Sequence, residues 1–257
     1  MVYSFKLSLA VFITIMTSLV IFPLGLFDRR GKVAYEISRC WAWGILKISG
    51  IRLNVQGVER LDSSRQYIFM ANHQSLLDIP ILVQSLLEFQ LRWIAKKELF
   101  YIPVFGWALW SSRHITVDRS SRTKASASFK KALERIKGGS SVVLFPEGTR
   151  GLGGGIMPFK RGGFVLAART KTPIVPVTIN GSGAILSKGN WRIRGGNVEV
   201  IVNDPIPLEQ QRPGNLRSLS TYVQGVMESR FRKQVGPFGD GSNQAQALVS
   251  AEPLVQG

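Results

Sequence analysis

Hydrophobic and polar positions follow different patterns on either side of about residue 50. Residues 7–27 form an apolar run of 21 residues without a charge, and a helix of that length can cross a hydrocarbon core of about 30 Å. Residues 33–48 have apolar positions at helical spacing, which predicts an amphipathic helix. The predicted apolar face carries Ile37, Trp41, Gly44, Ile45 and Ile48. Trp41 and Trp43 also suit a membrane interface.

The residues near the end of the apolar run bear on how it would meet a membrane. Arg29, Arg30 and Lys32 follow it, and this charge predicts that the end lies on the cytoplasmic side. No small-residue cleavage site follows, which argues against a secretory signal peptide. Pro23 and Gly25 complicate a straight span. Two alternatives stay open: a spanning helix, or two helices lying partly in one leaflet. A buried soluble helix is disfavoured, because so long an uncharged run is hard to bury in a small domain.

From residue 51 onward, short apolar runs alternate with amphipathic segments. The predicted strands are residues 51–55, 67–70, 91–95, 115–117, 141–145, 174–179 and 198–202. One predicted helix covers residues 79–87, with Pro80 in its first turn, and the last covers residues 216–233. Between them, Ser120 or Ser121 would cap a helix that Gly138 and Gly139 end. That helix would carry Ala125, Phe129, Leu133 and Ile136 on one face. The alternation predicts an α/β fold with a largely parallel central sheet flanked by helices.

The same patterns predict three regions. Residues 1–50 would be membrane-anchoring helices, and residues 51–235 would be one α/β domain. Residues 236–257 are rich in Gly, Ser, Gln and Pro, which predicts a disordered tail.

Composition narrows the classes of partner. The chain of 257 residues has a net charge of +17 and a pI of about 10.6, which implies anionic partners such as nucleic acid, an acidic membrane or phosphate-bearing substrates. No nucleic-acid-binding motif is present, and the basic residues are dispersed among apolar segments. The single cysteine, Cys40, excludes an intrachain disulfide. With two histidines and one thiol, a metal site is not expected.

A histidine and an aspartate stand five residues apart directly after a predicted strand. His73 and Asp78 could act as a base and the carboxylate that orients it, although a structural pair is the competing interpretation. The hydroxyl of Ser75 is expected to make local hydrogen bonds rather than act as a nucleophile. The second histidine, His114, is expected to be structural, since no carboxylate motif accompanies it.

Four clusters stand at predicted strand ends or in loops. They are residues 73–78, 117–119, 145–150 and 173–177. In open α/β sheets, ligands lie at the carboxyl ends of strands. The third cluster suits an anion: Pro146 and Gly148 shape a tight loop, and Arg150 offers a planar fork for phosphate or carboxylate. A turn with a solvated arginine is the alternative.

The order of these clusters resembles the 1-acylglycerol-3-phosphate O-acyltransferase family. Asn72-His73 followed by four residues and Asp78 is similar to its first motif, and Phe145-Pro146-Glu147-Gly148-Thr149-Arg150 to its third. Asp118-Arg119 looks like the end of its second motif. Further similar segments are residues 94–99, 102–103, 158–162 and 174–177. The resemblance covers about residues 51–207, and residues 51–235 would then be an acyltransferase domain with a glycerolipid acyltransferase-like fold. Gly151 departs from the family, which often has Ser there, and should change loop flexibility more than chemistry.

The resemblance implies a reaction and a set of site residues. A fatty acyl group would pass from an acyl thioester to the sn-2 hydroxyl of lysophosphatidic acid, giving phosphatidic acid. His73 would be the general base, Asp78 would orient it, and no acyl-enzyme would form. The expected substrate-binding residues are Lys96, Arg119, Glu147, Gly148, Thr149, Arg150 and Lys160. The cations among them would hold phosphate, and Glu147 would contact glycerol, organise its loop, or do both.

Partners and alternatives follow from the same reasoning. The acyl donor would be acyl-CoA or acyl-acyl carrier protein, as a substrate and not a cofactor, and no nucleic acid partner is expected. The membrane would be the inner membrane if the chain is bacterial, with the active site on its cytoplasmic face. Aromatic residues between 100 and 110 would touch lipid, hold an acyl chain or pack in the core. The alternatives are another acceptor, such as glycerol-3-phosphate, another lysophospholipid or a lyso-aminolipid, or a basic membrane scaffold without catalysis.

Overall fold

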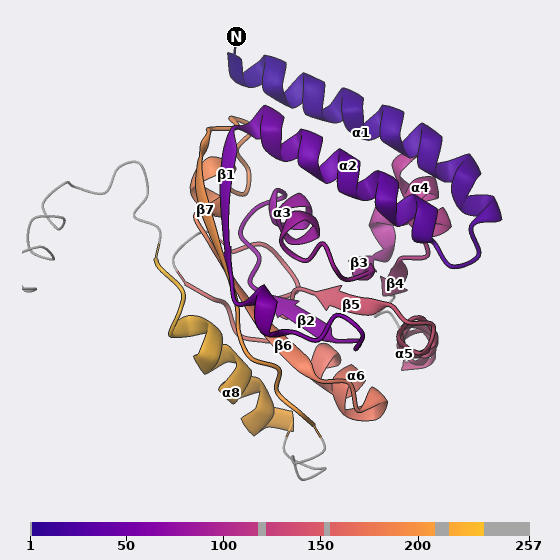
Figure 1. Ribbon diagram of the computed structural model, residues 1–257, viewed down its shortest axis with the longest axis vertical. Helices are drawn as coiled ribbons and strands as arrows, with labels where there is room; N and C mark the ends of the chain where they lie inside the picture. The colour runs from indigo at the N-terminus through magenta and orange to yellow at the C-terminus, as the bar shows by residue number, and fades with distance from the viewer. Residues whose placement is uncertain (1, 118–121, 152–154, 209–215, 234–257) are drawn as a thin grey trace, which may run out of the picture.

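A single mixed sheet forms the centre of the protein (Figure 1). The computed structural model describes residues 2–117, 122–151, 155–208 and 216–233. Within these ranges seven strands join in the order β1-β7-β6-β2-β5-β3-β4. Their bounds are β1 Ile51–Gln56, β2 Ile68–Ala71, β3 Leu91–Lys96, β4 Ile115–Val117, β5 Ser141–Leu144, β6 Ile174–Asn180 and β7 Gly196–Val202. All seven predicted strands are present, and the α/β prediction is confirmed.

Strand direction places most carboxyl ends at one edge of the sheet. Strands β2, β3, β4, β5 and β6 are parallel, whereas β7 pairs antiparallel with β6 and β1 follows the direction of β7. The central strands β2, β5 and β6 are buried along their whole length, as expected where helices cover both faces. The loops after the five parallel strands therefore meet on the same side.

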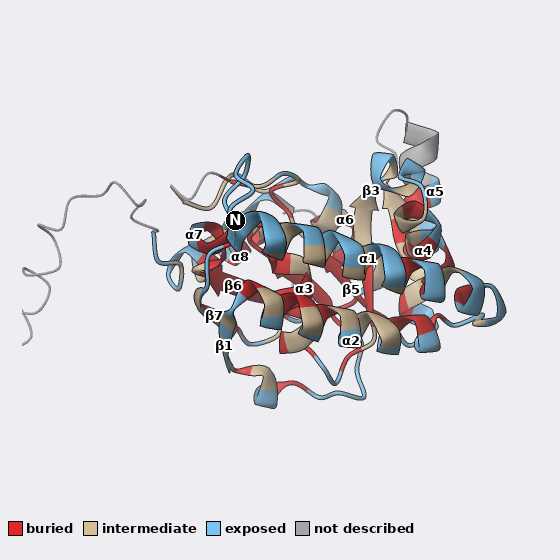
Figure 2. Ribbon diagram, turned by 90° about the horizontal axis from the view of Figure 1, so that it is seen from above, coloured by how far each residue is buried: buried red, intermediate tan, exposed pale blue. Residues whose placement is uncertain are grey.

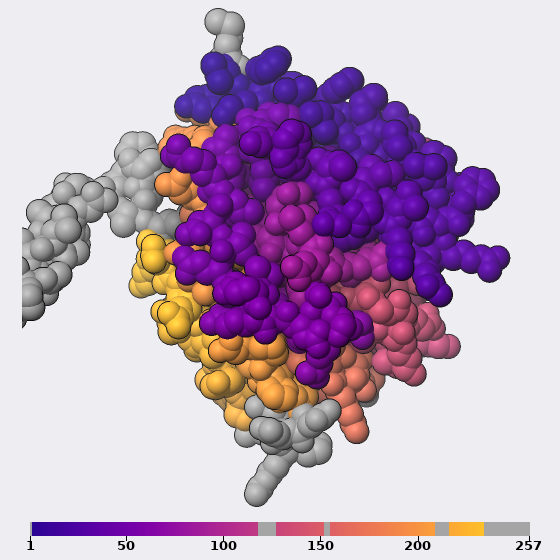
Figure 3. All heavy atoms as spheres, in the orientation of Figure 1, coloured from indigo at the N-terminus to yellow at the C-terminus, as the bar shows by residue number. Residues whose placement is uncertain are grey.

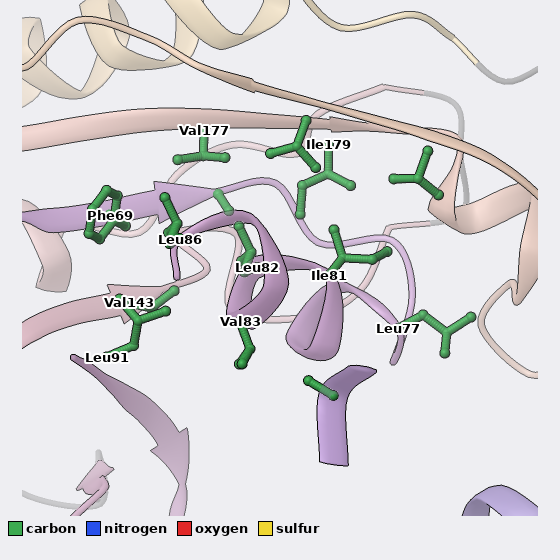
Figure 4. Packing of buried hydrophobic residues seen from close by; sticks show 14 of the residues in the cluster. Phe69, Leu77, Ile81, Leu82, Val83, Leu86, Leu91, Val143, Val177 and Ile179 are labelled. Atoms are coloured by element: carbon green, nitrogen blue, oxygen red, sulfur yellow. The ribbon is translucent and has the colours of Figure 1, made fainter. Parts of the chain in front are cut away.

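Helices cover both faces, and alternate side chains of the strands meet them. On one face, Phe69 and Val177 pack with α3 (Asp78–Ser85) and α2 (Lys32–Ser49). Figure 4 shows Ile81 and Leu82 of α3 among these side chains of the sheet. On the other face, Ile68 and Met70 pack with α5 (Arg122–Lys137), α6 (Gly162–Thr170) and α8 (Leu216–Glu228).

Several short elements differ from the sequence prediction. Helices α4 (Phe105–Ser111), α6 and α7 (Ser182–Ile185), and the 3-10 turns η1 (Val58–Arg60) and η2 (Lys97–Tyr101), were not predicted. They are short, and α6 begins with two glycines, which are weak helix formers. The last helix ends at Glu228, before the predicted residue 233. The capping residues Ser120 and Ser121, the tail at 236–257 and the side chain of Ala125 lie outside the described part, and the domain boundaries stay a prediction.

The N-terminal helices form an antiparallel pair on the face covered by α3 (Figures 1 and 2). Helix α1 spans Val2–Phe27 and is followed by α2. Lys6 Nζ near the start of α1 donates to Ser49 O at the end of α2, at 3.4 Å. Trp41 Nε1 donates to Thr14 Oγ1 at 3.0 Å. The pair is thus joined along its length.

The buried stripe of α2 differs from the predicted one. Of the five predicted positions only Ile45 is buried, and Trp41 is half-buried because it contacts α1. The small residues Ala34 and Ala42, with Leu46, face the core instead. A helix packed between α1 and the sheet has two contacting faces, whereas the prediction allowed for one.

Helix α1 exposes most of its apolar surface (Figure 2). It is the one helix among the described residues that is long and apolar enough to cross a membrane, and 17% of its most apolar window is buried. Phe5, Phe12 and Leu19 are 68%, 57% and 48% exposed. An apolar helix so exposed is consistent with membrane association.

A buried arginine attaches the turn between α1 and α2 to the sheet. Arg92 on β3 is fully buried and donates to Arg30 O at 2.6 Å and Gly31 O at 3.0 Å. Burial lowers the pKa of Arg92 to about 10, so it stays charged at neutral pH. On the same turn, Asp28 accepts from Ala34 N at 3.2 Å; backbone N–H groups outweigh its burial and hold the pKa of Asp28 below its usual value.

Candidate active site

The candidate site lies where the neighbouring strands β2 and β5 end. They pair in parallel, with Met70 opposite Leu144, so the residues after them leave the sheet side by side. Asn72 fixes the exit of β2. Its side chain donates to Ile179 O at 2.9 Å and accepts from Ile179 N at 2.7 Å, which extends the ladder between β2 and β6.

His73 and Asp78 are in contact. The distance from His73 Nδ1 to Asp78 Oδ2 is 2.8 Å. The same oxygen accepts from the backbone N of Gln74 at 2.7 Å and of Ser75 at 2.8 Å. The Asp78 side chain is fully buried in the first turn of α3, whereas the His73 side chain keeps 14% exposure. The aspartate is held inside the protein and the ring edge can be reached from outside.

The loop after β5 fixes His73 from the other side. Its ring stacks on Phe145, with ring centroids 3.8 Å apart and planes 9° from parallel. His73 N donates to Glu147 Oε1 at 2.7 Å, and His73 O accepts from Gly151 N at 2.8 Å. The first and third sequence clusters therefore form one site.

Glu147 faces the protein interior. It is 2% exposed, and its second oxygen, Oε2, accepts from Met157 N at 3.0 Å. Burial raises the pKa of Glu147 to about 7, against the opposing effect of the two backbone N–H groups, and the charge of Asp78 adds to the rise. Both carboxylate oxygens are engaged by the backbone.

The other predicted binding residues lie around this core. Gly148 has φ +71°, in the left-handed region that favours glycine, and a Cβ there would lie 2.8 Å from Lys160 Nζ. Thr149 and Lys160 are exposed and Arg150 is half-buried. Lys96 is exposed at the end of β3, two strands from β2 on the same edge. Arg119 lies outside the described residues.

The fourth sequence cluster does not belong to the site. Residues 174–177 lie inside β6, fully buried, with Pro176 opposite Met70 and Val177 opposite Ala71. The cluster lies at the beginning of β6 and not at its carboxyl end, which is at Asn180, so it is the grouping of this cluster with the site that was wrong. Its apolar side chains pack the core beneath the site.

Two other expectations concern side chains outside the catalytic pair. The Ser75 hydroxyl donates to Leu186 O at 2.7 Å and accepts from Leu77 N at 3.2 Å, so its predicted hydrogen-bonding role is confirmed. His114 Nδ1 accepts from Trp93 N at 3.3 Å. Burial, with Arg92 and Arg135 nearby, lowers the pKa of His114 to about 3, so it is neutral at physiological pH.

Sequence reasoning missed several contacts that support the site. Phe145 and Gly151 contact His73, and Met157 contacts Glu147, and none of these contacts was predicted. Position 151 has room for a side chain, since the nearest atoms would lie 3.7 Å from a Cβ. Within the described ranges, no group of three or more His, Cys, Asp or Glu side chains could hold a metal ion.

Comparison with known proteins places the chain among acyltransferases. A family model described as Acyltransferase matches residues 52–180, which is half of the chain and includes both loops of the site. A chloroplastic 1-acyl-sn-glycerol-3-phosphate acyltransferase of Brassica napus is 39% identical over 184 residues, covering 70% of this chain and 53% of that protein. The chain thus spans about half the length of that relative and of a similar one from Arabidopsis thaliana, for which the share is 51%.

Two further relatives match over more of their length. 1-acyl-sn-glycerol-3-phosphate acyltransferase alpha of Bos taurus is 33% identical over 199 residues, covering 77% of this chain and 69% of that protein. The crystal structure of the 1-acyl-sn-glycerophosphate (LPA) acyltransferase from Thermotoga maritima has a TM-score of 0.71 and 26% identity, covering 89% of this chain and 95% of that one. On these matches, the chain belongs to the acyltransferase family.

Proposed function

We propose that the chain transfers a fatty acyl group from an acyl thioester to the sn-2 hydroxyl of lysophosphatidic acid, giving phosphatidic acid. One observation carries the proposal: a reachable His73 ring, hydrogen-bonded to a fully buried Asp78, stands beside the loop that ends in Arg150. The Ser75 hydroxyl is committed to backbone hydrogen bonds, so the acceptor lipid supplies the nucleophile. Relatives named as 1-acyl-sn-glycerol-3-phosphate acyltransferases support this acceptor.

In the proposed mechanism, His73 moves one proton. Nδ1 of its ring donates to Asp78, which leaves Nε2 to accept the proton of the sn-2 hydroxyl. The alkoxide oxygen attacks the thioester carbonyl, and a carbon–oxygen ester bond forms as the carbon–sulfur bond breaks. The imidazolium returns its proton to the leaving thiolate. Asp78 stabilises the imidazolium between these steps, and no acyl-enzyme forms.

The substrate phosphate would be held by cations at the same edge of the sheet. Arg150 follows the loop that contacts His73, and Lys96 ends a nearby strand. Lys160 lies against Gly148, where the absence of a side chain lets its ammonium approach the loop. Thr149 and Arg119 are further candidates. A guanidinium can bind two phosphate oxygens at once, which suits Arg150 to the main contact.

The acyl donor would be acyl-CoA or acyl-acyl carrier protein, and no resident cofactor takes part. Both carriers are anionic, which suits a chain with a net charge of +17.

A related reaction with another acceptor, such as glycerol-3-phosphate, another lysophospholipid or a lyso-aminolipid, would use the same His73–Asp78 pair. The other alternative is a basic membrane scaffold without catalysis. Such a scaffold would have no use for a buried Asp78 hydrogen-bonded to a partly exposed His73.

An acceptor panel tests this proposal. Purified protein with a labelled acyl thioester is expected to acylate lysophosphatidic acid faster than glycerol-3-phosphate or neutral and amino lysolipids, because Arg150 binds the phosphate. Replacing Arg150 by glutamine should raise KM for lysophosphatidic acid roughly 10- to 100-fold, the loss of one strong charged hydrogen bond. Arg217→Gln, at an exposed arginine of α8 that has no proposed part in the site, is the matched control. A preference for an acceptor without phosphate would contradict the proposal.

We also propose that α1 lies in one leaflet instead of crossing the bilayer. Lys6, Thr14 and Ile21 all make hydrogen bonds to the rest of the protein, so α1 is attached near its start, middle and end. A helix attached to a polar domain along its length cannot enter a bilayer end-on. In Figure 3 the indigo atoms of this helix cover the top of the molecule. This arrangement supports a chain bound to one surface of a membrane. The cytoplasmic face, of the inner membrane if the chain is bacterial, is proposed from Arg29, Arg30 and Lys32 after the apolar run.

Vesicle flotation tests the role of this surface. Phe12→Asp and Leu19→Asp on α1 should each weaken binding to phospholipid vesicles by roughly tenfold or more, since each removes a large side chain from the apolar phase. Tyr222→Asp is the matched control, because Tyr222 is 57% exposed and belongs to α8, which lies across the sheet from α1 (Figure 1). Equal loss of binding in all three variants would contradict the assignment of the α1 surface.

A further inference from the structure

The backbone of His73 is hydrogen-bonded on both sides by the loop that follows β5. Its N–H donates to Glu147 Oε1 at 2.7 Å, and its C=O accepts from Gly151 N at 2.8 Å. The contact with Asp78 fixes the ring alone, whereas these two bonds fix the main chain that carries it. The position of the ring therefore depends on residues more than 70 positions away in the sequence.

Glu147 is oriented toward this backbone and away from solvent. It is 2% exposed, and its second oxygen accepts from Met157 N at 3.0 Å. Among the described residues no cation forms an ion pair with it. A carboxylate that contacts a glycerol hydroxyl would need an oxygen that substrate can reach, and both oxygens of Glu147 are engaged inside the protein.

We propose that Glu147 is a positioning residue that joins the His73 loop to the segment around Met157 and so holds the histidine ring toward the acceptor hydroxyl. This inference rests on the proposed role of His73 as the base. In this role, Glu147 affects the rate of the chemical step and does not bind the acceptor.

The protonation state of Glu147 should then affect activity. Burial and the charge of Asp78 raise the pKa of Glu147 to about 7. His73 and Asp78 face it from the β2–α3 loop, and Arg150 and Lys160 are the charged side chains of the loops beside it. An ionised carboxylate accepts at both oxygens, whereas the protonated form has one oxygen that donates. Above about pH 7, Glu147 therefore accepts from both His73 N and Met157 N, and this link weakens as the pH falls below 7.

Three variants test the inference. Glu147→Gln should lower kcat roughly 100-fold, the effect of a displaced catalytic group, with KM for lysophosphatidic acid within about threefold of wild type. An amide cannot accept at both ends, and it does not titrate, so the inflection of kcat near pH 7 that belongs to Glu147 should disappear. Glu147→Asp keeps the charge but is one methylene shorter, so it should retain the inflection with a smaller loss of kcat. Glu88→Gln, at an exposed carboxylate, is the matched control and should behave as wild type.

Two results would overturn the inference. One is a rise in KM for the acceptor with kcat preserved, which would mean direct contact with substrate; the other is wild-type kcat and pH dependence in both variants. If Glu147→Gln does not fold, the KM and kcat of Glu147→Asp decide between the same outcomes. His73→Ala is measured alongside. If it keeps full activity, the proposed function has the wrong base; if it is inactive while Glu147→Gln is not impaired, only the positioning role fails.

Discussion

Replacing His73 by alanine is expected to lower the rate of acyl transfer by roughly 10²- to 10⁴-fold, the range that positioned acid–base groups contribute. The variant removes a ring that is hydrogen-bonded to a buried carboxylate and belongs to a partly exposed side chain. Its bonds to Glu147 and Gly151 use backbone atoms, so the loops should stay joined and the protein folded. Membrane binding, for which α1 is the proposed surface, should be unchanged.

The second histidine provides a control within the same chain. His114 accepts a hydrogen bond from Trp93 N through Nδ1 and is neutral because its pKa is about 3. In His114→Asn the amide oxygen can take the place of Nδ1, so this variant should retain activity within a few-fold. Radiolabelled acyl transfer and vesicle flotation measure the two properties separately. Full activity in His73→Ala would contradict the mechanism, and a joint loss of activity and membrane binding would favour a general defect.

The contact between His73 and Asp78 was accessible to sequence reasoning because it is local. Five residues separate the two side chains, and a strand followed by a helix start brings such positions together. The central strands could also be predicted from local sequence, because strands buried on both faces are continuous apolar runs. The Ser75 hydroxyl could be judged from its neighbourhood as well.

The bonds between the two loops depend instead on strand order. His73 and Glu147 meet because β5 lies beside β2, and no local pattern specifies that neighbour. The same limit explains why residues 174–177 were grouped with the site, although they begin β6 in the core and the carboxyl end of that strand is at Asn180. It also explains α2, whose second contacting face exists only because α1 packs on it.

Strand order also explains how a site can form without a protein nucleophile. Parallel neighbours β2 and β5 deliver a base and an arginine-bearing loop to one edge, while β6 holds Asn72 beneath them. The apolar helix α1 is attached to the same domain. In the mechanism proposed above, a lysolipid acceptor brings the hydroxyl that acts as the nucleophile.

Replacing Asp78 by asparagine should show how much of the rate depends on the charge behind His73. Asp78 Oδ2 accepts from the His73 ring and from two backbone N–H groups. An asparagine oxygen could keep those bonds, but it would no longer stabilise the imidazolium, so kcat should fall roughly 10²- to 10⁴-fold. Asp62→Asn, at an exposed aspartate that accepts from Ser64, is the matched control and should leave kcat unchanged.

The double variant gives the sharper measurement. If Asp78 acts through His73, adding Asp78→Asn to His73→Ala should cause little further loss, because residues that act as a unit are strongly non-additive. Thermal melting of each protein separates this effect from a loss of folding, since Asp78 also orders the loop that precedes α3. A multiplicative loss in the double variant, with all proteins folded, would mean that the aspartate contributes independently of the histidine. The pair would then not be a base and its orienting carboxylate.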